Sequence, residues 1–218
     1  MNLTESEAYR GARIAEYVAS VADETADEWY EVIERCAAVQ SNDMAMFPSF
    51  VEFLKQLAAR NPDIVLAYLK RGDALTSFLP AVLAGLAASS KPCIANSLME
   101  DWTAREQHLA ASARHLRLTR GASEDLLRKV AEKALTLKEP VAIIEVIAAI
   151  VANDAIALVD PILVPAVKYL TSIKDTRWSA GIGFMPEIMA FIAKISQPQC
   201  EVLLENLVLC RLLISTES

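Results

Sequence analysis

The chain has 218 residues and a mass of 23.8 kDa, enough for one domain, or two small ones, with a substantial buried core. Apolar residues make up 54% of it and charged residues only 22%, which excludes a disordered chain. The formal net charge of −7 argues against a dedicated nucleic-acid binder, because such proteins concentrate Lys and Arg against phosphates. Alanine and leucine supply 61 residues, and since both favour helices the composition predicts an all-α protein.

Apolar side chains recur at helical spacing along most of the chain, and the clearest run extends from Leu75 to Leu86. The alternation typical of strands is not visible, so we expect essentially no sheet. Pro48, Pro62 and Pro140 stand where helices should begin, because the first helical residue needs no N–H. We predict about a dozen helices, over residues 4–22, 25–40, 47–60, 62–71, 74–88, 92–105, 107–119, 122–137, 140–152, 160–174, 180–195 and 198–215.

The connections between these helices are short, which makes consecutive helices antiparallel neighbours. From residue 62 onward they pair into helical hairpins that begin roughly 30–38 residues apart, a period typical of helical repeats. The segments NPDIVLAYLKRG, KPCIANSLMEDW and VDPILVPAVKYL look like first helices of successive units. In this layout, and in the Asp160-Pro161 start of the third segment, the chain resembles the HEAT/armadillo-like α-solenoids over residues 47–215.

The resemblance implies an α-solenoid: one all-α domain, 1–218, in which helices of residues 1–46 cap the stacked hairpins of 47–218. An irregular helical bundle is the alternative.

Residues that could carry chemistry are few. His108 and His115 lie seven residues apart on one predicted helix, about 10 Å along its axis and too far to share one metal ion. The Gly181-Ile182-Gly183 segment lacks the third glycine of a dinucleotide loop, and the chain contains neither GxxxxGK[ST] nor GxSxG. We therefore assign no catalytic, cofactor-binding or metal-binding residue and predict that the protein is not an enzyme.

The four cysteines are far apart and form no metal-binding spacing, and the N-terminus is polar and acidic. The most apolar stretch, residues 141–167, is interrupted by acidic residues and prolines, so we expect no membrane span. A cytoplasmic location follows from these features as an expectation.

Two segments are candidates for binding a protein partner. An acidic stripe contains Glu24, Glu28 and Glu31, which share one helix face and suit a basic partner, or are simply solvated. Residues 174–187 are the least helical stretch and contain Arg177, Trp178 and Phe184, residue types typical of interaction hot spots. The alternative is that Trp178 fills a gap between two helices. A basic segment, residues 114–133, is a weaker candidate for an anionic or phosphate partner.

The last predicted helix is apolar around most of its circumference, and Leu204, Val208 and Leu212 extend over more than one of its faces. Such a helix is normally covered on both sides. We therefore predict that further repeats, a second copy of the protein or a partner packs against it.

These expectations favour a non-enzymatic protein–protein interaction or scaffold module acting through the surface of a helical-repeat domain. The alternatives are a regulatory or sensor segment of a larger protein and a HEAT-like enzyme that binds or repairs DNA, which the net charge of −7 disfavours.

Overall fold

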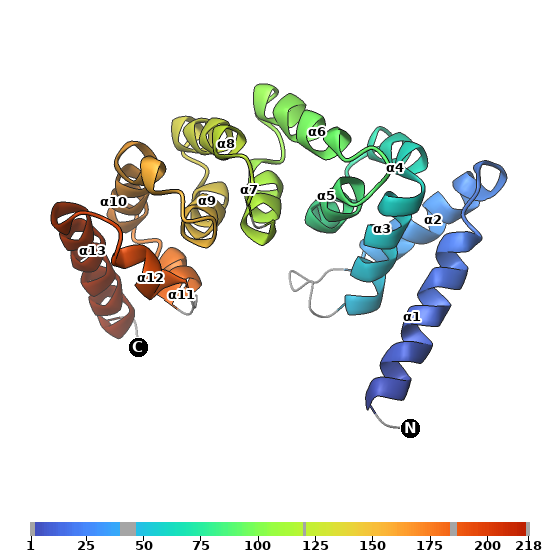
Figure 1. Ribbon diagram of the computed structural model, residues 1–218, viewed down its shortest axis with the longest axis horizontal. Helices are drawn as coiled ribbons and strands as arrows, with labels where there is room; N and C mark the ends of the chain where they lie inside the picture. The colour runs from blue at the N-terminus through green and yellow to red at the C-terminus, as the bar shows by residue number, and fades with distance from the viewer. Residues whose placement is uncertain (1–2, 40–46, 120, 184–186, 217–218) are drawn as a thin grey trace. The chain divides into compact units, whose positions relative to one another are not determined.

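The computed structural model describes residues 3–39, 47–119, 121–183 and 187–216, and these are helical with short connections and contain no strand (Figure 1). The chain is all-α, as the composition predicts. It divides into two compact units, Met1–Met99 and Glu100–Ser218. The division lies inside a helix. Within unit 1, the third helix packs on the first and the fifth and so joins the N-terminal helices to the rest of the unit.

Unit 1 begins with α1 and ends in the first part of α6. Pro48 and Pro62 are the first residues of α3 and α4, as predicted from the missing N–H of proline. The elements are α1 (Leu3–Ala19), the 3-10 helix η1 (Asp23–Thr25), α2 (Ala26–Ala37), α3 (Pro48–Arg60), α4 (Pro62–Leu69), the 3-10 helix η3 (Thr76–Phe78), α5 (Leu79–Ala87) and α6 (Cys93–Ala104).

The core of unit 1 lies where α3 packs against α1, α4 and α5. Gly85 of α5 is at the closest approach, since a Cβ built there would lie 2.1 Å from the carbonyl oxygen of Lys55 in α3. Tyr68 of α4 is buried, and its hydroxyl donates to the carbonyl oxygen of Ala26 at 2.7 Å. Burial raises the pKa of this tyrosine.

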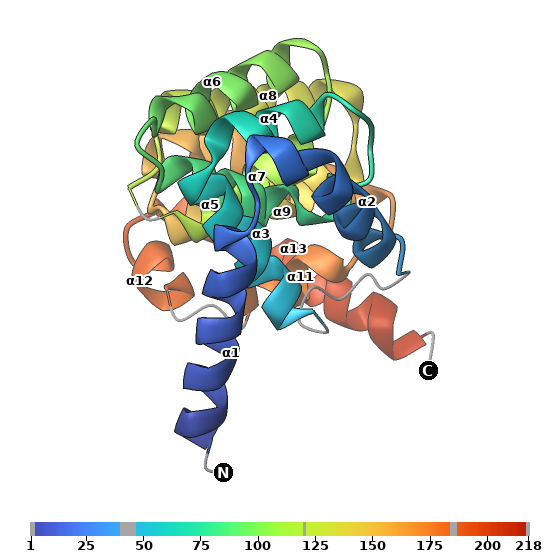
Figure 2. The same ribbon diagram turned by 90° about the vertical axis from the view of Figure 1, so that its right-hand side faces the viewer.

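Helix α1 is held at one end only. From Glu5 onward, its buried side chains are Ile14 and Val18, followed by Val21 just beyond the helix, whereas Tyr9 is 62% exposed. Figure 2 shows the N-terminal half of α1 extending beyond the other helices of its unit.

Unit 2 is organised around α9, which is buried along most of its length and contacts α7, α8, α10, α11 and α12. Helix α13 packs on α10. The elements after α6 are α7 (Leu109–Leu118), α8 (Glu124–Leu137), α9 (Pro140–Ala152), the 3-10 helix η4 (Ile156–Leu158), the π-helical turn η5 (Val159–Leu163), α10 (Val164–Ser172), α11 (Arg177–Gly183), α12 (Ile188–Ile192) and α13 (Gln197–Thr216).

The predicted helices agree with the observed ones to within a few residues. The exception is the range 180–195, which corresponds to two short helices, α11 and α12. The pair α8 and α9 is in contact as predicted, and the most extensive contacts join alternate helices, α3 with α5 and α7 with α9. The HEAT-like solenoid stays a prediction. Among the described residues no helix is both long and apolar enough to cross a membrane.

Candidate functional site

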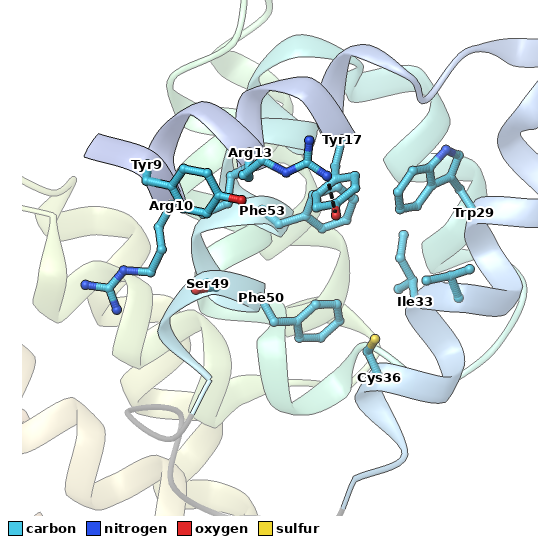
Figure 3. A pocket seen from close by; sticks show the side chains of 12 residues that line it. Tyr9, Arg10, Arg13, Tyr17, Trp29, Ile33, Cys36, Ser49, Phe50 and Phe53 are labelled. Atoms are coloured by element: carbon cyan, nitrogen blue, oxygen red, sulfur yellow. Dashed lines mark hydrogen bonds between the residues drawn. The ribbon is translucent and has the colours of Figure 1, made fainter. Parts of the chain in front are cut away.

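Helices α1, α2 and α3 of unit 1 surround a hollow of about 420 Å³ (Figure 3). We call this hollow the aromatic groove. Each helix contributes one stripe of side chains three or four residues apart, which is the spacing that places residues on one helix face. The stripes consist of Tyr9, Arg10, Arg13, Ile14 and Tyr17 from α1, of Trp29, Val32, Ile33 and Cys36 from α2, and of Ser49, Phe50 and Phe53 from α3.

Aromatic contacts shape the wall of the groove. The ring of Trp29 meets Tyr17 edge-on at 6.0 Å between centroids and stacks on Phe53 at 5.5 Å. Phe50 contacts Phe78 edge-to-face at 4.9 Å. Phe53 is buried, whereas Trp29 and Phe50 are only half-buried and leave aromatic surface facing the hollow. Covering aromatic surface of this kind with another apolar group is favourable, because it removes the surface from water.

Positive charge lies along the α1 side of the groove. A guanidinium nitrogen (Nη2) of Arg13 donates to the hydroxyl oxygen of Tyr17 at 3.0 Å, and its Cζ lies 5.0 Å from the centre of that ring. Arg13 also pairs with Glu16. The bond to Tyr17, and after it the charges nearby, raise the pKa of Arg13. Arg10 forms no ion pair with any residue that the structure describes. These two arginines are the only basic residues among the first 34.

The side chains that line the groove are suited to binding. Its titratable side chains are two arginines, two tyrosines and the free thiol of Cys36, with no carboxylate or histidine among the lining residues. Across the described parts of the chain, no three His, Cys, Asp or Glu side chains come together to hold a metal ion. The arrangement suits an apolar group inserted among the rings and a negative charge beside the arginines.

Trp178 does not lie on an exposed loop, so the expectation that it forms an interaction hot spot there is wrong. It belongs to α11 and is fully buried, while its indole Nε1 has no hydrogen-bond partner in the described structure. The carboxylate of Asp175 accepts from the backbone N–H of Arg177, the first residue of α11, at 3.2 Å.

Arg177 is exposed but paired, because its guanidinium donates two bonds to Asp175, at 3.0 and 2.6 Å. Phe184 lies outside the described residues.

The acidic stripe is exposed, and the structure divides it. Glu28 and Glu31 belong to α2 but do not line the groove, whereas Glu24 lies in the preceding η1. All three side chains face solvent. They remain accessible to a basic partner.

The basic segment is largely neutralised by acidic neighbours. Arg117 pairs with Glu145 at 3.1 Å and Lys133 with Glu106 at 3.1 Å. Lys129 pairs with Asp125 at 2.7 Å, and this hydrogen bond raises the pKa of the lysine.

Leu204, Val208 and Leu212 are exposed on α13, at 48%, 56% and 58%. The described helices leave these three side chains uncovered. That further repeats, a second copy or a partner packs against them stays a prediction.

The apolar spacing in the sequence predicts the three helices that line the groove but not the groove between them. A signal was present, since seven of the fourteen aromatic residues fall between Tyr9 and Phe53. Such a concentration near one end of a helical chain favours a binding surface as much as a core.

Comparison with protein-family models, with curated proteins and with solved structures finds no match to this chain. Function is therefore inferred from the groove itself.

Proposed function

We propose that this protein is a non-enzymatic protein-interaction module whose aromatic groove binds an amphipathic helix of a protein partner. The proposal is supported chiefly by the aromatic rings from three helices that line the groove and are only partly covered, with two arginines along one side. Helix-in-groove recognition uses apolar side chains three and four residues apart, and the stripes that line this groove have the same spacing.

A macromolecular partner fits the groove better than a small ligand. Small-molecule sites usually enclose most of the ligand surface. Here the lining side chains are themselves open to solvent, with Tyr9 62%, Tyr17 45% and Val32 36% exposed. Exposed apolar surface gathered in one place is typical of protein–protein contacts.

The test is affinity capture with matched baits, followed by mass spectrometry. Val32→Glu places a carboxylate in the groove at an exposed position, and Val141→Glu makes the same change at a 50% exposed position of α9. We expect proteins captured by the wild type to be retained by Val141→Glu and lost from Val32→Glu. A third bait with Glu28→Lys and Glu31→Lys tests the acidic face. Capture that is unchanged by Val32→Glu would contradict the proposal.

A further inference from the structure

The exposed face of α13 has the chemistry of a ligand for the aromatic groove. Glu201, Leu204, Glu205, Val208 and Leu212 follow one another at helical spacing, and all are exposed. The opposite face holds the buried Leu203 and Cys210, and α13 packs on α10. The exposed face is thus acidic in its first turns and apolar in its last, over about 16 Å at the rise of an α-helix.

The groove shows the complementary order along α1. Arg10 and Arg13 follow Tyr9 in α1 and precede Tyr17, which has Trp29 of α2 beside it. A helix laid parallel to α1 would place Glu201 and Glu205 near the two arginines, and Val208 and Leu212 near the rings. Opposite charges at one end and apolar groups at the other fix the direction of the docked helix.

We infer that α13 of one copy of this protein docks into the aromatic groove of a second copy, head to tail. This inference rests on the proposed function, because it assigns a ligand to the same groove. Both surfaces belong to every chain, so each copy presents one groove and one helix face. Contacts of this heterologous kind add one copy after another, and the assembly either closes into a ring or remains an open chain.

Two variants, each with one surface disabled, test the inference. Val32→Glu disables the groove and Val208→Glu disables the helix face; the two valines are 36% and 56% exposed, so both chains should fold. Far-ultraviolet circular dichroism confirms folding, and Val141→Glu serves as the control. Sedimentation at increasing concentration measures the mass of each variant and of their equimolar mixture.

We expect the wild type and the control to form species of at least twice the 23.8 kDa chain mass, and each disabled variant to stay monomeric. Their mixture should form a one-to-one pair and nothing larger, because the Val208→Glu chain keeps an intact groove and the Val32→Glu chain keeps an intact α13. Each disabling change should weaken self-association by at least about tenfold, the effect of a buried unpaired charge.

A monomeric wild type at all concentrations overturns the inference, whether α13 folds back on its own chain or is covered by another protein. Self-association that survives in Val32→Glu but not in Val208→Glu also overturns it, because that pattern means α13 pairs with α13. In either case loss of captured proteins from the Val32→Glu bait would still support the proposed function, so the two failures are distinguishable.

Discussion

Gly85 is the position where the smallest change should have a large effect. A methyl group there would lie 2.1 Å from the carbonyl oxygen of Lys55 and 2.7 Å from the Cβ of Ala58. An ordinary contact to that oxygen would be more than an ångström longer, and the oxygen belongs to the backbone of α3, which cannot turn aside as a side chain can. Gly85→Ala therefore forces α3 and α5 apart, and their contact is the most extensive in unit 1.

The sign of the effect is the informative part. In an exposed helix, replacing glycine with alanine stabilises by about 1 kcal/mol. At Gly85 this gain opposes an overpacking cost of about 3 kcal/mol or more, at the upper end of the usual range because backbone must move. We expect a net loss of about 2 kcal/mol, which lowers the melting temperature by roughly 4–8 °C for a chain of this size.

Thermal and urea unfolding followed by far-ultraviolet circular dichroism measures the change. Gly11→Ala in α1 is the matched control, because a Cβ at Gly11 meets nothing within 4 Å. We expect that variant to be unchanged or stabilised by up to about 1 kcal/mol. A Gly85→Ala protein that melts at or above the wild-type temperature would refute the close packing of α3 on α5.

Three further outcomes follow from the packing and the electrostatics. Leu79 is 2% exposed, and Leu79→Asp should unfold unit 1. The change loses about 2 kcal/mol of apolar burial and adds a cost of several kcal/mol for burying a carboxylate. A melting temperature unchanged within a few degrees would show that Leu79 is not in the core. Trp178→Ala should cost about 3–5 kcal/mol in urea unfolding, whereas Trp178→Phe, which removes a buried N–H without a partner, should cost far less. The hydrogen bonds from Arg177 lower the pKa of Asp175, so their stabilisation is complete above the ordinary aspartate pKa of about 4 and is lost as the pH falls through the lowered value. Arg177→Gln should raise the pKa of Asp175 in a carboxyl NMR titration and lower stability at neutral pH but not in strong acid; an unmoved pKa would contradict the pairing.

Local signals were sufficient for most helix boundaries. Proline at a first helical position marked the starts of α3, α4 and α9, and the predicted range 140–152 coincides with α9. Some helix ends carry no such signal: Lys138 and Asp154 adopt left-handed backbone at the ends of α8 and α9, where glycine would be expected.

Surfaces made by several helices were beyond the reach of local signals. The stripe containing Trp29, Val32 and Cys36 predicts a face of α2, but the same pattern fits a closed core and an open groove equally well. Only the placement of α1 and α3 decides between them. The prediction for Trp178 failed in the opposite sense: residues 174–187 were expected to be the least helical stretch, but helix α11 begins there beside the carboxylate of Asp175. The exposed face of α13 could be anticipated because its apolar residues exceed what one buried side can hold.

The one-sided support of α1 has a consequence for how the groove responds to a ligand. Amide hydrogen exchange reports the free energy of local opening, which is near zero where a helix has no buried side chains and rises where packing begins. In α1 packing begins at Ile14, so the turns that carry Tyr9 and Arg10 should exchange fastest among the groove walls. A ligand seated on Arg10 must spend part of its binding free energy on ordering those turns. Slower amide exchange there is consequently a direct measure of groove occupancy.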